Sequence, residues 1–181
     1  SFYYDTARPS VAVNSSATEY TNVSPIPVSL DFNEPMYSGV AASDLVVTNG
    51  QVNATAFDAS GNPAFALEVT PAGEGAVTIR YPNRAGYDRA GNLNTGSNTL
   101  VRYYDITAPN ATLTTTVEPY RAGAPEDVLH TRVSPIPVHA QWSEPVVGFG
   151  SGDPSVVGGG VTAFAEDGGG TDEGFQMSIT P

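Results

Sequence analysis

Four residues with side-chain oxygen atoms are the candidates for chemistry in this sequence: Asp5, Glu34, Asp88 and Asn92. Asp5 stands near the start of the chain, and Glu34 follows a run of alternating apolar residues. Asp88 and Asn92 share the loop G-Y-D-R-A-G-N. Calcium takes six to eight oxygen ligands from carboxylates, side-chain amides and backbone carbonyls. If the fold brings these segments together at one end, the four residues predict a calcium site.

A purely structural interpretation of the same residues stays open. Asp and Asn in a Gly-containing loop close turns by bonding to nearby backbone N–H groups. Asp88 and Asn92 could do this, and Glu34 could cap backbone amides beside Pro35. The spacing of these residues does not decide between a cation site and turn chemistry.

The elements that would position these residues are short β-strands. Apolar residues alternate with polar ones, as in Val28, Leu30 and Phe32, which predicts that one face of each strand is buried. No segment keeps a helical period, and clusters of Gly, Pro, Asn and Asp separate the runs. The pattern predicts an all-β immunoglobulin-like sandwich. The expected strands are residues 10–13, 28–32, 45–48, 53–57, 64–70, 76–81 and 98–104.

The sequence contains an internal repeat. The hexamer V-S-P-I-P-V begins at residue 23 and again at residue 133, an offset of 110. The segment P-A-F-A-L-E-V-T-P (63–71) matches E-G-F-Q-M-S-I-T-P (173–181) at the same offset. Upstream, Y-Y-D-T-A-R-P (3–9) matches Y-Y-D-I-T-A-P (103–109) at an offset of 100. The chain therefore reads as two copies of one module, with about ten extra residues in the second.

The repeat sets the expected domain organisation. Residues 1–4 read as the end of a preceding repeat or a linker, residues 5–104 as repeat 1 and residues 105–181 as repeat 2. Repeat 2 has no counterpart of the last two strands of repeat 1 within this chain. We expect its core to be completed by residues beyond this sequence, by another chain or by a rearranged pairing.

The repeat also predicts a second candidate cation site. Asp105 occupies the position of Asp5, and Glu144 occupies the position of Glu34. The loop that holds Asp88 and Asn92 has no counterpart in repeat 2. The second site is therefore expected to have fewer ligands, and to lie near the junction of the two repeats.

Composition narrows the possible partners. The chain has 19 acidic residues against 7 basic ones, all of them Arg, and a formal net charge of −12. This balance disfavours nucleic acid and anionic membranes, which bind basic surfaces, and it favours a divalent cation. The absence of Cys excludes disulfides and zinc–thiolate sites. No membrane-spanning segment is visible, so membrane insertion is not expected.

Several motifs in order resemble a bacterial Ig-like repeat: S-P-I-P-V-x-L-x-F-x-E-P-M, then S-D-L-V-V-T-N-G, V-T-P-A-G-E-G-A-V-T-I and Y-D-R-A-G-N. Such repeats occur in tandem in large secreted adhesins and surface proteins. The resemblance implies a sandwich fold, an extracellular location, a spacer or adhesive role and calcium near domain junctions. The implied partners are neighbouring repeats or subunits, surface glycans, and host or abiotic surfaces.

Catalysis is not expected, because the chain has two His, no Cys and no recognisable nucleophile or phosphate-binding motif. Two alternatives to a spacer remain. One is a filament subunit that a neighbouring chain completes by strand donation. The other is a carbohydrate-binding module, in which Trp142 would stack on a sugar instead of packing in the core.

Overall fold

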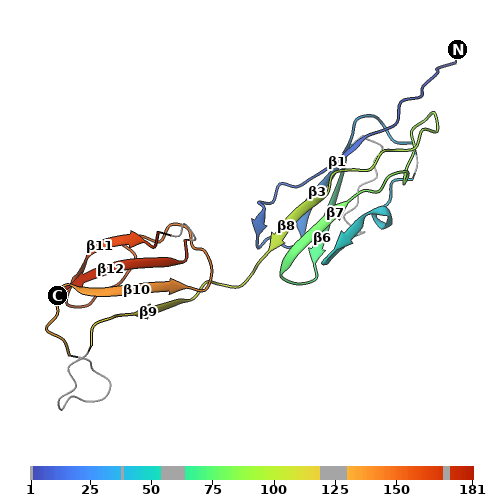
Figure 1. Ribbon diagram of the computed structural model, residues 1–181. Helices are drawn as coiled ribbons and strands as arrows, with labels where there is room; N and C mark the ends of the chain where they lie inside the picture. Colours follow the sequence, from blue (N-terminus) through green and yellow to red (C-terminus); the bar gives the residue numbers. More distant parts are fainter. Residues whose placement is uncertain (1, 38, 54–63, 119–129, 169–171) are drawn as a thin grey trace. The chain divides into compact units, whose positions relative to one another are not determined.

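The protein is all-β, as the sequence predicts (Figure 1). The structure is a computed structural model, which describes residues 2–37, 39–53, 64–118, 130–168 and 172–181. Within these ranges there is no α-helix, and the one helical element is a short 3₁₀ turn, η1. The chain divides into two compact units, Ser1–Ile106 and Thr107–Pro181.

The first unit is a sandwich of two four-stranded sheets. One sheet has the strand order β1-β3-β6-β5, and the other has the order β2-β8-β7-β4. Both are antiparallel except for the β2–β8 pair, which is parallel. The elements are β1 (Val11–Asn14), β2 (Tyr20–Thr21), β3 (Ile26–Phe32), η1 (Ala42–Asp44), β4 (Val46–Thr48), β5 (Gly50–Val52), β6 (Ala64–Pro71), β7 (Gly75–Arg80) and β8 (Leu100–Tyr104).

The core of the first unit follows from the period-two pattern of its strands. On β3 every second residue is buried, and Leu30 at its centre is 0% exposed. The facing sheet contributes Val77 and Ile79 from β7, also 0% exposed. Phe32 packs edge-on against Tyr81, with ring centroids 5.5 Å apart. The apolar residues that alternate in the sequence therefore fill the space between the two sheets.

Some elements differ from the sequence-based expectation. Strand β3 begins two residues earlier than expected and contains Pro27. Strand β2 was not expected, because two residues are too few to show alternation. It is held by the stacking of Tyr20 on Tyr103, at 5.0 Å between ring centroids. Of the strand expected at 53–57, residues 54–57 lie outside the described part of the chain. The described strand that precedes it in the sequence is β5.

The second unit holds four strands in a single sheet of order β11-β12-β10-β9. Its core is small: Ala140, Phe175 and Met177 are buried, with partly buried apolar residues around them. Among the described residues of this unit there is no second sheet. Its elements are β9 (Ala111–Thr114), β10 (Ile136–Trp142), β11 (Gly160–Glu166) and β12 (Gly174–Thr180).

Candidate metal site

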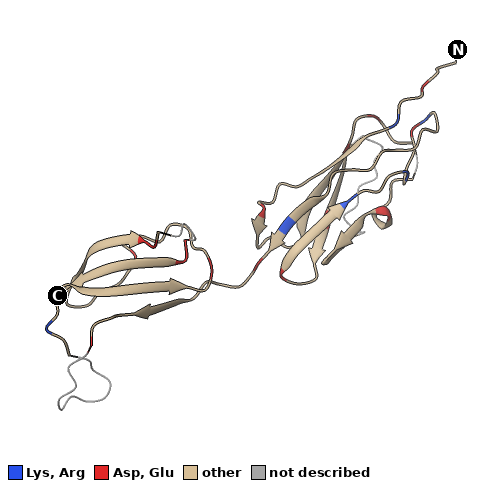
Figure 2. Ribbon diagram, viewed as in Figure 1, with Lys and Arg blue, Asp and Glu red and all other residues tan. Residues whose placement is uncertain are grey.

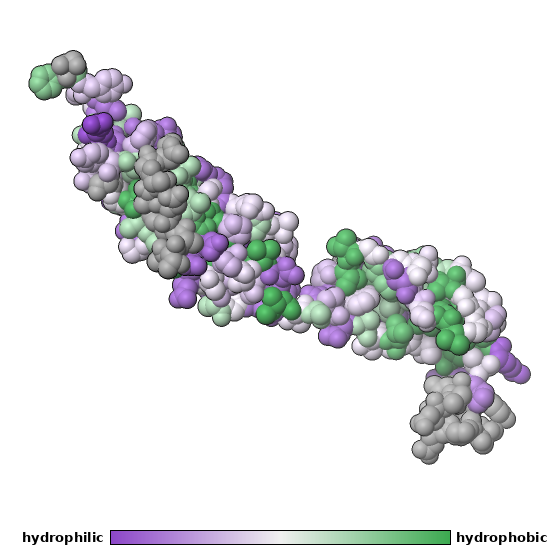
Figure 3. Space-filling view, turned by 180° about the vertical axis from the view of Figure 1, so that it is seen from behind, coloured by the Kyte–Doolittle hydropathy of each residue, from purple (hydrophilic) through white to green (hydrophobic). Residues whose placement is uncertain are grey.

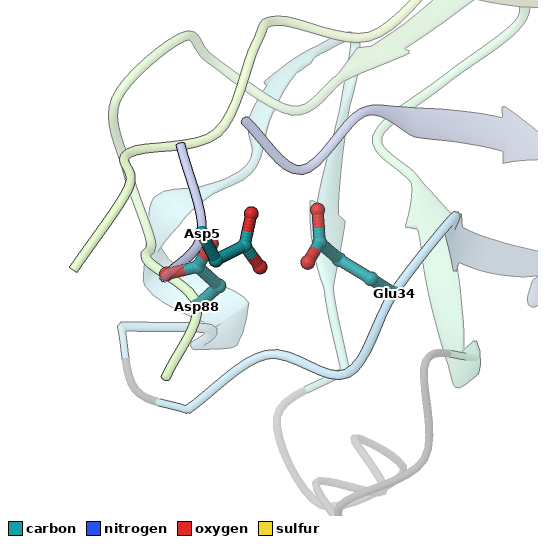
Figure 4. Close-up of side chains that lie close together, drawn as sticks. All are labelled: Asp5, Glu34 and Asp88. Atoms are coloured by element: carbon teal, nitrogen blue, oxygen red, sulfur yellow. The ribbon is translucent and has the colours of Figure 1, made fainter. Parts of the chain in front are cut away.

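Three of the predicted ligands meet at one end of the first unit. Asp5 lies in the entry segment before β1, Glu34 lies two residues after the end of β3, and Asp88 lies in the loop between β7 and β8. One carboxylate oxygen from each lies within 4.8 Å of the others. Figure 4 shows the carboxylates of Asp5 and Glu34 facing one another, with Asp88 beside Asp5. Three segments far apart in the sequence thus place carboxylates around one point.

Asp88 is the most strongly held of the three. It is 3% exposed, and its carboxylate accepts backbone hydrogen bonds of 2.8 Å from both Ala90 and Asn92. Burial by itself would raise the pKa of Asp88, but the hydrogen bonds from Asn92 and Ala90 outweigh it and hold the pKa below its ordinary value. Gly91, at φ +89°, allows the tight turn that aims these N–H groups at the carboxylate. These hydrogen bonds therefore favour the ionised form of Asp88 and fix its orientation.

Asn92 lies beside the carboxylates but faces them with its amide nitrogen. The side-chain Nδ2 donates to Asp88 Oδ2 at 2.9 Å and to the backbone carbonyl of Asp5 at 3.2 Å. Both partners are acceptors, which sets the orientation of the amide. In this geometry Asn92 positions two of the candidate ligands rather than offering its own oxygen. It also joins the entry segment to the β7–β8 loop.

Glu34 shows the electrostatic cost of bringing the carboxylates together. Partial burial raises the pKa of Glu34, and the negative charges of Asp5 and Asp88 raise it further. A cation placed among the three would reverse this effect, because it stabilises the ionised form. The site is thus a concentration of negative charge with the ligand type that calcium prefers.

Two residues that the sequence did not single out support the site. Asn94 is 0% exposed, and its Oδ1 accepts a 2.8 Å bond from the Gly86 backbone while its Nδ2 donates to the Pro82 carbonyl. Arg8 donates to the carbonyls of Leu93 and Asn94 at 2.7 and 2.6 Å. Arg8 therefore ties the segment that carries Asp5 to the loop that carries Asp88. The partners of Arg8 are distant in sequence, whereas those of Asn94 lie in the same loop region. The only local signal was therefore an Asn within a Gly-containing loop.

The second predicted site is divided between the two units. Asp105 belongs to the first unit, where its backbone N–H donates to the Thr21 carbonyl at 3.0 Å. Glu144 belongs to the second unit and lies two residues after the end of β10. Among the described residues, the grouping of three carboxylates occurs at Asp5, Glu34 and Asp88. The pairing of Asp105 with Glu144 stays a prediction.

The two-sheet fold of the first unit agrees with the comparison to known families. A family model described as the bacterial Ig-like domain matches residues 5–104. The chain belongs to this family, as the resemblance in its motifs indicated. No match to a curated protein was found.

Proposed function

We propose that this chain is a load-bearing spacer segment of a bacterial surface array, in which calcium bound by Asp5, Glu34 and Asp88 fixes the entry segment to the body of the first unit. Bacterial Ig-like domains are generally structural, extracellular modules without catalytic activity. In the described part of the chain, no helix has the length and apolar character needed to cross a membrane.

The observation that carries the proposal is the convergence of the three carboxylates within 4.8 Å. The two like-charged neighbours of Glu34 destabilise its ionised form, so the arrangement has an electrostatic cost without a counter-ion. A calcium ion would offset this cost and add bonds between three chain segments. Backbone carbonyls and water would complete its coordination.

The mechanical consequence concerns the start of the first unit. The entry segment before β1 is held by Arg8 and by the bond from Asn92 to the Asp5 carbonyl. Exposed tyrosines precede it, with Tyr3 93% and Tyr4 90% exposed. An ion on Asp5 would fix the direction in which this segment leaves the sandwich. A rigid exit at each domain end would keep a tandem array extended under load.

Thermal unfolding with calcium and with chelator tests this proposal. Calcium at about a hundredfold excess over its dissociation constant contributes about 2.7 kcal/mol, a rise in Tm on the order of 10 °C for a domain of this size. Glu34→Gln should abolish most of the rise. Glu19→Gln, which removes an exposed charge elsewhere in the same unit, should retain it. Equal melting curves in calcium and chelator would remove the calcium proposal.

The structure gives Trp142 a packing role. Its ring packs edge-on against Phe149 at 5.2 Å between centroids, next to the buried cluster of Ala140, Phe175 and Met177. This agrees with the interpretation of Trp142 as a core residue. Nothing in the described residues specifically favours the carbohydrate-binding alternative.

A further inference from the structure

The first unit carries a pair of stacked tyrosines at its surface. Tyr20 on β2 and Tyr103 on β8 lie with their ring centroids 5.0 Å apart and their ring planes 18° from parallel. Tyr20 is 70% exposed and Tyr103 is 39% exposed. Both rings lie outside the buried core cluster of the unit. The two phenols therefore contact each other and are open to reagents in solution.

The backbone fixes the register of this pair. Tyr20 lies directly opposite Tyr103 in the parallel pairing of β2 with β8. The Tyr103 N–H donates to the Glu19 carbonyl at 2.7 Å, and the Asp105 N–H donates to the Thr21 carbonyl at 3.0 Å. Because these two hydrogen bonds flank the pair, the two tyrosines are held as cross-strand neighbours.

Arg102 adds a further anchor between the same two segments. Its Nε donates to the Ala17 carbonyl at 2.9 Å, and its Nη2 donates to the Ser15 carbonyl at 3.3 Å. In Figure 2 this residue is the basic position on β8. The segment that leads into the two-residue strand β2 is thus tied to β8 by a side chain as well as by the strand pairing.

Two exposed phenols in contact are suited to oxidative coupling. Loss of one electron and the hydroxyl proton converts a tyrosine into a phenoxyl radical, whose unpaired electron is shared with the ortho carbons of the ring. Two adjacent radicals form one C–C bond between ortho carbons, and each ortho hydrogen then moves to the oxygen, which restores the phenol. With hydrogen peroxide as the oxidant, two tyrosines and one peroxide give one dityrosine and two waters.

Other tyrosines of the unit are less suited to this reaction. Tyr81 is 1% exposed, and its hydroxyl donates to the Gly39 carbonyl at 3.1 Å, so the fold shields it from an oxidant. Tyr37 and Tyr87 lie farther apart, at 6.1 Å between centroids, and their planes are tilted by 43°. The Tyr20–Tyr103 pair combines the shorter separation with the nearly parallel planes.

Tyr3 and Tyr4 are a different case. They are 93% and 90% exposed, and Figure 3 shows the entry segment that carries them projecting from the body of the first unit. Radicals formed there would meet other molecules, so these residues are expected to give links between chains.

Composition restricts the covalent links that this chain can form. It contains no Cys, which excludes disulfides, and no Lys, which excludes amide links from a lysine side chain. It contains nine Tyr. Coupling of tyrosines is therefore a cross-linking chemistry that the chain retains.

We propose that Tyr20 and Tyr103 form a modification site, at which a haem peroxidase with hydrogen peroxide joins the two rings as dityrosine within one chain. The link ties β2 covalently to the end of β8, the last strand of the first unit. A cross-link between residues so distant in sequence restricts the unfolded chain and stabilises the fold. The reaction goes beyond the proposed spacer role and is independent of calcium binding.

The test treats the full chain, at low protein concentration, with hydrogen peroxide and a haem peroxidase. We expect dityrosine fluorescence from a monomer whose mass is lower by two hydrogen atoms. Cleavage after Arg and tandem mass spectrometry should then identify a link between Tyr20 and Tyr103. In calorimetry the Tm of the first unit should rise by about 10 °C or more, while that of the second unit should not move.

Conservative variants separate this pair from the other tyrosines. Tyr20→Phe and Tyr103→Phe keep an aromatic ring at each position, so the stacking is retained, but each should remove the link and the rise in Tm. Tyr104→Phe is the matched control, because the neighbouring ring on β8 packs against the core instead; it should retain the link. Replacing Tyr3 and Tyr4 by Phe should reduce dimers between chains and leave the internal link unchanged.

Two results would overturn the proposal. One is the absence of a link between Tyr20 and Tyr103 under conditions that convert free tyrosine to dityrosine. The other is an equal yield of internal dityrosine in Tyr20→Phe and in the unaltered chain, which would place the coupling at another pair.

Discussion

Asn92 holds both carboxylate oxygens of Asp88: its backbone N–H donates to Oδ1 at 2.8 Å and its side-chain amide donates to Oδ2 at 2.9 Å. The sequence left open whether these residues close a turn or bind a cation. The two roles are compatible, since the bonds that close the turn also aim Asp88 toward Asp5 and Glu34. Turn geometry is thus the means by which the loop presents a carboxylate.

The first prediction concerns Asn92→Ala. Loss of the amide frees one oxygen of Asp88 and the carbonyl of Asp5, so calcium affinity should fall on the order of tenfold, as for other residues that orient metal ligands. Calorimetric titration with calcium measures this directly. The unfolding transition of the second unit serves as the internal control and should not move. A change in affinity below about twofold would show that Asn92 does not position the ligands.

A second prediction is a pH dependence at Glu34. Because the pKa of this carboxyl is raised in the folded state, the folded protein binds its proton more tightly than the unfolded chain. Without calcium, the stability of the first unit should therefore fall as pH rises from the ordinary Glu pKa through the raised one. Calcium binding requires the ionised form, so its affinity should rise over the same interval.

Glu34→Gln provides the check on that pH dependence. The variant cannot ionise at this position, so its stability without calcium should change less as pH rises above the ordinary Glu pKa of about 4.3. Chemical denaturation at several pH values, with chelator present, compares the two proteins. An unchanged slope in the variant would assign the pH dependence to other carboxyls.

The third prediction compares matched positions in the two repeats. Val13 lies between the two sheets of the first unit and is 0% exposed. Leu113 occupies the matching position in the single described sheet of the second unit and is 65% exposed. Val13→Ala should cost about 1.5 kcal/mol, from two buried carbon groups at about 0.8 kcal/mol each. Leu113→Ala should cost less than about 0.5 kcal/mol, as at other exposed sites. Equal losses in the two variants would mean that the second unit covers Leu113 in solution.

The fourth prediction concerns the acid stability of the second unit. Asp167 Oδ2 lies 2.6 Å from His139 Nε2, and this hydrogen bond is the main reason that the pKa of Asp167 is lowered; Gln176 also contributes. The stabilisation is complete above the ordinary Asp pKa and is lost as pH falls through the lowered one. Unfolding followed by Trp142 fluorescence should show this loss as pH falls below the ordinary Asp pKa of about 3.9. Asp167→Asn should flatten that part of the profile, and His139→Gln should reduce it.

The strands and the candidate ligands were largely predictable from local patterns. Alternating apolar residues placed β3, β6 and β7, because a strand exposes its side chains to two faces in turn. That fold also predicted that Asp5 lies in the entry segment and that Glu34 and Asp88 lie in loops at the same end of the unit. The roles of Arg8 and Asn94 did not follow, because each depends on contacts that the strand pattern does not specify.

The sequence by itself determined the repeat, the alternation of its strands and the acidic balance. These are properties of order and composition, which need no long-range contact. Only the tertiary structure decided that three carboxylates lie within 4.8 Å and that Phe149 packs on Trp142 as Tyr81 packs on Phe32. Such contacts join residues whose distance is set by strand register and loop closure, which no local pattern specifies.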